Sequence, residues 1–306
     1  MTSNVSASVK ARLLNKVDSD RTRFGLLLVR YACERFLYRL GKSGEPCVLK
    51  GATLLGIWME EPHRTTRDID LLTTGENDEE AVRRVMTTIC NVPCPEDGLI
   101  FDLDTLQVSS IRDNQRYGGQ RARLVARLGR AEIPVRVDFG FGDVVTPGPE
   151  EAQLPTLIDG VPAPLLQAYP QVTTIAEKFE AMVQLGSRNS RMKDFYDIWA
   201  LSENFGFDGA ELQQAVAACF ERRGTHLPAE MPEALSPAFY SNSEQHRWWQ
   251  DYGRRDELLH APPDDFEEVG SRVQSFLGPV YTSILANETF DLHWPGSGPW
   301  QARPRR

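Results

Sequence analysis

The chain has 306 residues, of which 41% are hydrophobic and 25% charged, with a formal net charge of −9. This composition is typical of a globular protein and excludes a disordered chain, while the acidic balance argues against a protein that coats nucleic acid non-specifically. The chain contains no run of about 18 apolar residues, so the sequence predicts no membrane span. The segment 1–10 is polar and has no apolar signal region. We therefore expect a cytoplasmic protein with no membrane partner.

The spacing of apolar residues predicts helices first and a mixed α/β region after them. Residues 8–40 show helical periodicity, and a polar stretch at 18–23 is a place where this helix can divide in two. From residue 45 onward, short apolar runs and alternating patterns replace that periodicity. They predict strands at 47–49, 68–72, 99–110, 120–129 and 133–141, with helices at 52–59 and 79–90.

A proline-rich connector at 147–164 separates this region from a second series of helices. We predict these helices at 172–185, 191–203, 208–222 and 266–285, with a loop-rich segment at 225–263. Asp208 and Glu211 form a capping box for the third of them. The resulting domain prediction is an N-terminal helical segment (1–44), a sheet domain (45–146), a helical domain (165–290) and an irregular tail (291–306).

The five cysteines are an odd number scattered through the chain, which is typical of reduced thiols. Cys90 and Cys94 lie four residues apart, but no second Cys/His pair completes a zinc site, so we interpret both as buried thiols.

Asp68 and Asp70 are the strongest candidates for chemistry. Residues i and i+2 of a strand share one face, so the two carboxylates lie side by side, with apolar residues on the opposite face. Neighbouring carboxylates repel each other unless a cation lies between them, and Mg²⁺ prefers carboxylate oxygens together with a substrate phosphate. Asp138, on the polar face of another predicted strand, is a candidate third carboxylate.

An Asp-x-Asp pair alone is common on solvated strand faces, so the upstream segment matters. Gly51 follows a short strand and opens a predicted helix, which places backbone N–H groups where a triphosphate could bind. Thr53 can add a hydroxyl donor. The glycine and the aspartates lie within twenty residues, a spacing that allows one pocket.

These residues resemble a known family. Leu49-Lys50-Gly51-Ala52-Thr53-Leu54 and Arg64-Thr65-Thr66-Arg67-Asp68-Ile69-Asp70-Leu71 are similar to the opening motif of the AbiEii/AbiGii-type toxins, which include the mycobacterial MenT toxins. Ile175–Ala181 and Arg191–Ile198 resemble the second signature, so the resemblance covers roughly residues 45–205. Two departures are Ala52, where a glycine or serine is common, and Thr66, where a serine often stands.

The resemblance implies an α/β (α+β) fold: a polymerase β-like nucleotidyltransferase mixed sheet with N-terminal helices and a C-terminal helical domain that completes the active site. It implies a toxin that uses a nucleoside triphosphate (NTP) and Mg²⁺ or Mn²⁺, is paired with an antitoxin, and transfers a nucleotide to the 3′ acceptor end of tRNA. Asp68 and Asp70 would be metal ligands, completed by Lys178, Asp194 and Asp197. Gly51, Ala52, Thr53, Thr66 and Lys178 would contact the nucleotide.

The residues of the second signature allow alternatives when read alone. Lys178 lies in the apolar stripe of its helix, so it either reaches the solvent rim or points into a cavity toward an anion. Asp194, near its helix start, can simply complement the helix dipole after a Ser190 cap. Asp197 lies one turn further among apolar residues, where a carboxylate needs a partner.

Three functions remain open from the sequence. The first is the RNA-directed toxin, in which arginines between Arg112 and Arg136 help to hold a phosphate backbone; the alternative for these arginines is a solvated strand face. The second is transfer of a nucleotide or phosphate to a protein or small-molecule hydroxyl. The third is a non-catalytic protein that binds a partner through its Trp-rich C-terminal region.

Overall fold

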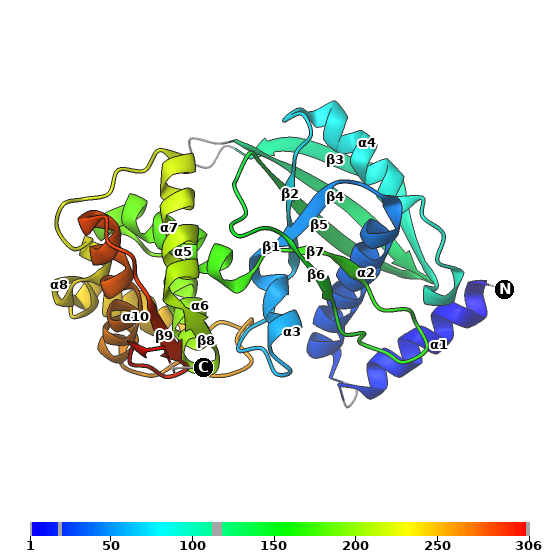
Figure 1. The fold of residues 1–306 in the computed structure, drawn as a ribbon. Helices are drawn as coiled ribbons and strands as arrows, with labels where there is room; N and C mark the ends of the chain where they lie inside the picture. Colours follow the sequence, from blue (N-terminus) through cyan, green and yellow to red (C-terminus); the bar gives the residue numbers. More distant parts are fainter. Residues whose placement is uncertain (1, 18–19, 112–117, 304–306) are drawn as a thin grey trace. The chain divides into compact units, whose positions relative to one another are not determined.

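The computed structural model describes residues 2–17, 20–111 and 118–303, and the chain divides into two compact units (Figure 1). The first unit comprises residues 1–142 and 150–169, and the second comprises 143–149 and 170–306. Arg112 and Arg116 of the arginine-rich segment lie outside the described residues.

The first unit contains a seven-stranded mixed sheet in its described residues, with strand order β3-β4-β5-β2-β1-β7-β6. Its strands are β1 (Cys47–Lys50), β2 (Asp68–Thr73), β3 (Leu99–Ile111), β4 (Gly119–Leu128), β5 (Ala131–Phe141), β6 (Glu150–Gln153) and β7 (Leu165–Ala168). Its helices are α1 (Thr2–Asn15), α2 (Arg21–Ser43), α3 (Leu55–Trp58) and α4 (Glu79–Cys90), with 3-10 turns η1 (Gly51–Leu54) and η2 (Pro95–Asp97).

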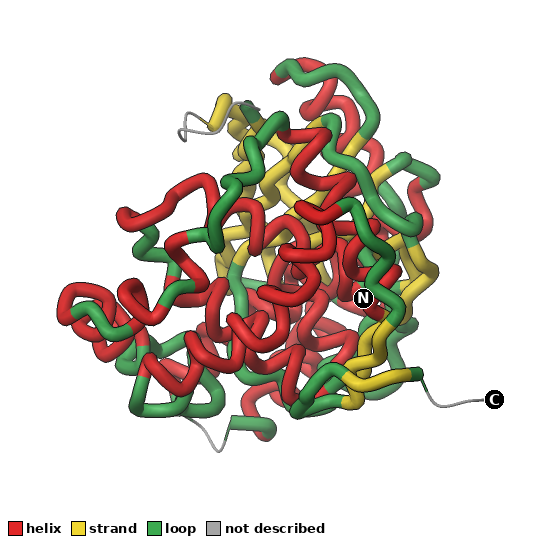
Figure 2. Tube along the Cα trace, turned by 60° about the vertical axis from the view of Figure 1, so that its left-hand side comes forward, coloured by secondary structure: helices red, strands yellow, loops and turns green. Residues whose placement is uncertain are grey.

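Antiparallel and parallel pairs alternate around β2, which is the strand that carries the two aspartates. β2 pairs antiparallel with β1 and parallel with β5, while β1 also pairs parallel with β7. Figure 2 shows these strands gathered together in yellow. The mixed α/β fold class predicted from the sequence is confirmed.

One face of this sheet is apolar and covered by helices. Ile69, Val137 and Ala122 lie next to one another on β2, β5 and β4 and are fully buried. On the same face, Phe36 of α2 makes an edge-on ring contact with Phe101 of β3 at 5.9 Å between centroids. The strict in–out alternation of β4 and β5 follows from burial of only one face. The opposite face, called here the open face, carries the charged residues.

The second unit is mainly helical. Its elements are α5 (Gln171–Leu185), α6 (Met192–Asn204), α7 (Gly209–Arg223), α8 (Pro237–Tyr240), α9 (Ser243–Tyr252), α10 (Phe266–Ala286), the turns η3 (Gly186–Arg188) and η4 (Glu233–Leu235), and the strands β8 (Gly206–Asp208), β9 (Leu292–Pro295) and β10 (Gln301–Ala302). The predicted cap of α7 is present, because Asp208 accepts a hydrogen bond from the backbone N–H of Glu211 at 3.1 Å.

The C-terminal tryptophans belong to the core of the second unit. Trp249 and Trp294 are 2% and 0% exposed, and Trp294 donates its indole N–H to the Ser202 carbonyl oxygen at 2.7 Å. The tail predicted as irregular contains β9 and β10, which join β8 in a three-stranded sheet. Trp249 and Trp294 are therefore packing residues of this unit.

No helix in the described part of the chain is both long enough and apolar enough to cross a membrane.

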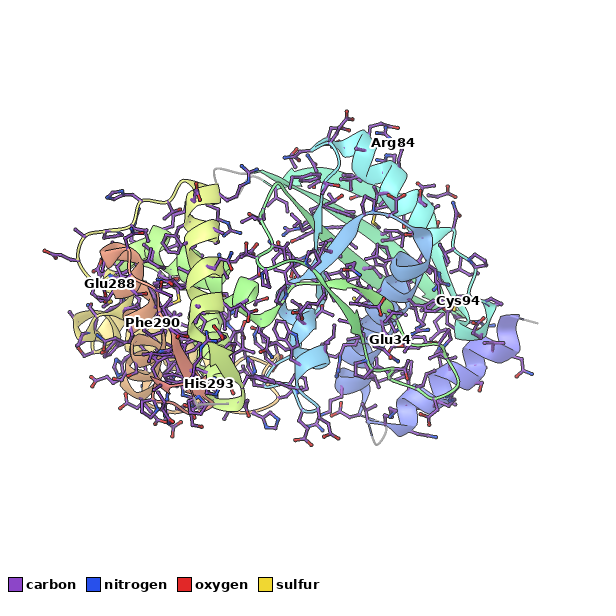
Figure 3. All side chains as sticks on the ribbon, in the orientation of Figure 1. Glu34, Arg84, Cys94, Glu288, Phe290 and His293 are labelled. Atoms are coloured by element: carbon purple, nitrogen blue, oxygen red, sulfur yellow. The ribbon has the colours of Figure 1, made fainter. Side chains whose placement is uncertain are left out.

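All five cysteines are free thiols, and four of them are buried (Figure 3 labels Cys94). Burial raises the pKa of Cys33, Cys90, Cys94 and Cys219 to about 12, and that of Cys47 to about 11. We therefore expect reaction with a disulfide reagent at pH 8 to be at least roughly 100-fold slower in the native protein than in urea, because so little thiolate forms. Rapid titration of native thiols would contradict this.

Candidate functional site

Asp68 and Asp70 occupy the first and third positions of β2 and point to the open face of the sheet. The residues between and after them, Ile69 and Leu71, are fully buried on the other face, which fixes the orientation of the strand. The Asp68 side chain is 28% exposed, so it is half-buried rather than in open solvent. The predicted side-by-side arrangement of the two carboxylates is present.

The strand register places charged residues of both signs in two rows across the open face. In the first row, Lys50 of β1, Asp70 of β2, Asp138 of β5 and Arg121 of β4 are successive neighbours. In the second row, Asp68 of β2 is followed by Arg136 of β5 and Arg123 of β4. The expectation that Asp138 lies near the aspartate pair is met at the level of the backbone.

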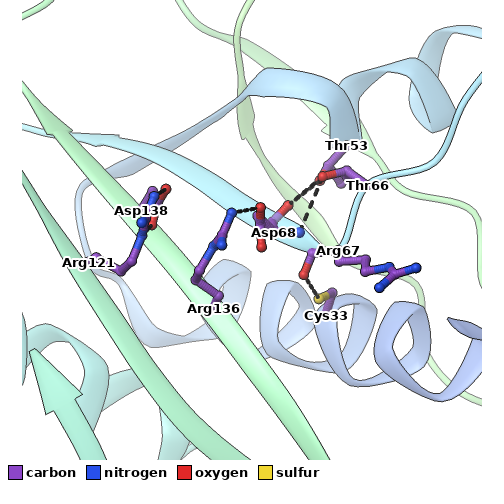
Figure 4. A network of polar contacts seen from close by, with 8 residues as sticks. All are labelled: Cys33, Thr53, Thr66, Arg67, Asp68, Arg121, Arg136 and Asp138. Atoms are coloured by element: carbon purple, nitrogen blue, oxygen red, sulfur yellow. Dashed lines mark hydrogen bonds and ion pairs between the residues drawn. The ribbon is translucent and has the colours of Figure 1, made fainter. Parts of the chain in front are cut away.

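Arginines contact two of these three carboxylates (Figure 4). Arg136 forms an ion pair with Asp68, and Arg121 binds both oxygens of Asp138 at 2.7 and 2.6 Å. The alternation of residues 133–141 predicts that Arg136 and Asp138 share one strand face, but it does not predict these pairs. The two guanidinium groups thus offset part of the negative charge that is clustered on this face.

Gly51 brings the polypeptide backbone directly against Asp70. It has a positive φ of 75°, and a Cβ atom added there would overlap with the Asp70 carboxylate and lie 2.8 Å from its Cγ atom. Only glycine fits both restrictions. The predicted pairing of this glycine with the aspartate strand in one place is therefore present.

We expect Gly51→Ala to reduce nucleotide transfer more than 10-fold and to lower stability by ~1–2 kcal/mol, because the added methyl group must displace Asp70 and the residue keeps a left-handed backbone. Gly56→Ala is the matched control, since a Cβ atom there meets nothing within 4 Å. Assays of transfer and thermal melting on both variants make the comparison. Equal activity of the two variants would show that Asp70 need not stay in place.

Thr53 and Thr66 support the backbone of Asp68. Thr66 accepts a hydrogen bond from the Asp68 N–H at 3.2 Å, and the Thr66 and Thr53 hydroxyls donate to the Asp68 carbonyl oxygen at 3.3 and 3.5 Å. These two threonines, with Ala52 and Asp68, also line a pocket of the first unit that continues to Arg30. The hydroxyls predicted to contact a nucleotide thus hold the start of β2 in this structure.

A second polar cluster lies within the second unit and contains the three residues predicted from its signature. Lys178 of α5 places its ammonium nitrogen 2.9 Å from Asp194 Oδ1 and 2.7 Å from Asp197 Oδ2, both on α6. Arg191 adds a contact of 2.7 Å to the other oxygen of Asp194. Lys178 therefore points toward this cluster, and Asp197 has the partner that its buried position requires.

Both aspartates of this cluster are fully buried, with 0% exposure. Burial would raise the pKa of Asp194, but the adjacent Lys178 and Arg191 outweigh it, and the pKa of Asp194 is lowered. Asp194 is therefore ionised at neutral pH. Its role is more than the helix-dipole complement that the sequence left open, because it joins α5 to α6 through Lys178.

A third group of charges in the second unit surrounds Arg223, and it was not predicted from the sequence. Its guanidinium contacts Asp143 at 3.1 Å, Glu177 at 3.1 Å and Glu180 at 2.8 Å. Burial would lower the pKa of Arg223, but the charges of Glu177 and Asp143 outweigh it and the pKa is raised. Asp143 is 80 residues distant in sequence, so only the i, i+3 spacing of the two glutamates could have signalled part of this cluster.

The sequence motif implies that a divalent cation binds on the open face. Within the described residues, no three Asp, Glu, His or Cys side chains are gathered in a cation-binding arrangement. The donors are nevertheless of the right kind: half-buried carboxylate oxygens on one strand face, one of which already accepts a cationic partner in Arg136. The residues Asp68 and Asp70 fit a hard divalent ion in their chemistry.

Comparison with known proteins identifies one family. A sequence model of the family described as nucleotidyl transferase AbiEii toxin, type IV toxin–antitoxin (TA) system, matches residues 35–272. That range includes Gly51, both aspartates of β2 and the Lys178 cluster. A comparison with curated proteins gives no significant match.

Two solved structures show distant likeness. A candidate nucleotidyltransferase from H. pylori is 15% identical with a TM-score of 0.46, and the alignment covers 84% of this chain and 95% of that one. JHP933 from Helicobacter pylori is 13% identical with a TM-score of 0.41, covering 83% and 90%. Likeness at this level carries no argument about function.

Proposed function

The chain belongs to the AbiEii family of nucleotidyltransferase toxins from type IV toxin–antitoxin systems, and from this premise we propose that it transfers a nucleotide from an NTP to RNA. The acceptor we propose is the 3′ end of tRNA, whose modification prevents aminoacylation and so blocks translation. We further propose that it acts in the cytoplasm, where tRNA is charged, and that an antitoxin from the same system neutralises it.

One observation carries this proposal: Asp68 and Asp70 share the open face of β2, and Gly51 leaves bare backbone against Asp70. Nucleotide transfer requires that an attacking hydroxyl and a phosphate be held together while negative charge develops. Asp68 and Asp70 would hold Mg²⁺ or Mn²⁺, with Asp138 as a third carboxylate. The bound ion would neutralise charge on the phosphate.

The chain's own groups prepare this reaction in three ways. Thr53 and Thr66 fix the position of Asp68 through its backbone. Gly51 has no side chain of its own, so the backbone of the turn and the Asp70 carboxylate lie against each other where a phosphate would approach. Arg136 contacts Asp68, and it would release this carboxylate and bind a phosphate oxygen of the substrate in its place.

We propose that Lys178, Asp194 and Asp197 serve the same reaction. Two observations support a functional cluster: the family match includes it, and the two carboxylates hold the lysine ammonium in one place by contacts of 2.9 and 2.7 Å. A lysine fixed in this way is suited to bind a phosphate group. Transfer by Lys178 and Asp197 variants, measured against their folded fraction, tests this role.

The function is tested by incubating the purified protein with total tRNA, Mg²⁺ and each labelled NTP in turn. We expect label to enter RNA from one or two of the four nucleotides, to become soluble on ribonuclease treatment, and to disappear when EDTA removes the metal ion. Label that resists ribonuclease in a cell extract would instead favour a protein or small-molecule hydroxyl as acceptor. No label in any fraction, together with no melting-temperature shift by Mg²⁺ and NTP, would favour a non-catalytic role.

A further inference from the structure

Several charged residues of the open face form ion pairs within the described part of the chain, whereas Arg123 of β4 does not. Arg121 binds Asp138, Arg136 binds Asp68, and Arg127 contacts Asp102 at 2.9 Å and Glu132 at 3.3 Å. Arg123 lies between Arg121 and Arg127 on the same strand face and is exposed. It makes no hydrogen bond or ion pair with any residue that the structure describes.

The position of Arg123 is unfavourable for the isolated protein. Its direct neighbour on β5 is Arg136, another cation, and its neighbour on β3 is the uncharged Gln107. Like charges opposite each other in an antiparallel pair destabilise the sheet, with Cβ atoms about 5 Å apart. An anion bound between these two guanidinium groups would remove that repulsion.

The distance of Arg123 from the aspartate pair indicates which substrate would supply the anion. Arg123 is separated from Asp68 by one intervening strand, which corresponds to about 10 Å in the plane of the sheet. Gly51, where the triphosphate is proposed to approach, follows β1 on the opposite side of β2. A nucleotide at Gly51 would lie on the β1 side of Asp68, which leaves the β4 side for the acceptor.

We propose that Arg123 is a positioning residue that binds a backbone phosphate of the RNA acceptor strand, close to the end that receives the nucleotide. The proposal rests on the function proposed above. Arginine suits this task because its guanidinium binds phosphate oxygens in pairs, and a single strand tracks along positive charge without base recognition. The row Asp68–Arg136–Arg123 would then lead from the aspartate pair, where the RNA end reacts, to the RNA backbone next to that end.

The first test measures binding of a labelled single-stranded RNA by fluorescence anisotropy at several salt concentrations, using the full chain. Arg123→Ala should weaken binding about 5- to 10-fold and reduce the salt dependence by the equivalent of one phosphate contact, roughly 0.7 in the log–log slope. Arg123→Lys should recover most of both. Arg84→Ala is the control, because Arg84 is 61% exposed and lies on α4, which packs against β3 and β4 (Figure 3).

The second test separates the two possible sources of phosphate by kinetics. Arg123→Ala should raise KM for RNA by a similar factor while KM for NTP and kcat stay within about twofold of the wild type. A raised KM for NTP with an unchanged KM for RNA would assign Arg123 to the nucleotide and overturn the proposal. Identical salt slopes for Arg123→Ala and Arg84→Ala would overturn it as well. Failure of the wild type to label RNA would contradict the proposed function, while the binding experiment still decides the role of Arg123.

Discussion

Replacing Asp70 with asparagine should lower the rate of nucleotide transfer by roughly 10³-fold or more. The substitution keeps the size of the side chain and removes one of two charges that would hold the divalent ion. Loss of charge stabilisation worth several kcal/mol in the transition state corresponds to that factor. Initial rates with saturating NTP and RNA, together with growth arrest on induction in cells, measure the effect.

A defect in folding should not account for this loss of nucleotide transfer. Asp70 lies between Asp138 and Lys50 in the sheet, so removing its charge relieves one repulsion and loses one attraction. We expect Asp70→Asn to melt close to the wild-type temperature without metal, and Mg²⁺ with NTP to raise the melting temperature of the wild type alone.

Asp78→Asn provides the matched control for this experiment. Asp78 is an exposed carboxylate of the same unit that caps α4 by accepting from the Ala81 N–H at 2.8 Å. Asparagine caps a helix about as well as aspartate, so this variant loses one charge without losing the cap. Transfer by Asp70→Asn within about threefold of Asp78→Asn would show that Asp70 is not part of the reaction.

The sequence was informative about the strand that carries the aspartates because its signals are local. Alternation over 99–141 predicted β3, β4 and β5, and the apolar residues around Asp68 predicted which face the carboxylates take. The same alternation indicated that Arg136 and Asp138 share a face. Gly51 was predicted to bring the backbone close to a triphosphate, and the structure shows this backbone close to the Asp70 carboxylate.

The sequence could not show what lies across the sheet from each charge. Register decides that Asp68 faces Arg136 and that Asp138 faces Arg121, and the order β4-β5-β2 is not sequential along the chain. Short strands such as β6 and β8 carry too few residues for a period of two to stand out. The Arg223 cluster escaped for a similar reason, since Arg223 and its partners come from three separate segments.

Two carboxylates of the open face are paired with arginines, and the two arginines differ in their exposure to solvent. Arg136 reaches Asp68 from the neighbouring strand, and the side chain of Arg136 is 39% exposed, so it has solvent to move into when a competing cation arrives. Arg121 binds Asp138 with two hydrogen bonds and is more buried, at 24%. Asp138 should therefore be released less readily than Asp68.

Replacing Lys178 with methionine should destabilise the second unit by roughly 3–5 kcal/mol and abolish nucleotide transfer. Methionine keeps the apolar stem but removes the cation that lies 2.7 Å from the fully buried Asp197, while Asp194 retains Arg191. Removing one partner of a buried ion pair is costly because the attraction is lost while the other charge stays buried. Urea denaturation followed by tryptophan fluorescence reports on this unit through the buried Trp249 and Trp294.

The pH dependence identifies the cause of the destabilisation. In the wild type the pKa of Asp194 is lowered in the folded state, so its contribution to stability is present at neutral pH and is lost as pH falls through that lowered pKa. Lys178→Met reduces this contribution and favours protonated aspartates. The stability difference between variant and wild type should therefore be largest near pH 7 and shrink below about pH 4.

Neutralising Asp197 gives the decisive comparison. The double variant Lys178→Met/Asp197→Asn should be more stable than Lys178→Met alone, because the buried site that has lost the lysine cation then contains one negative charge fewer. Arg247→Met on α9 is the control, since its side chain is 70% exposed and its removal should change stability by less than about 0.5 kcal/mol. If the double variant is no more stable than the single one, the lysine acts through packing, and the electrostatic account of this cluster is wrong.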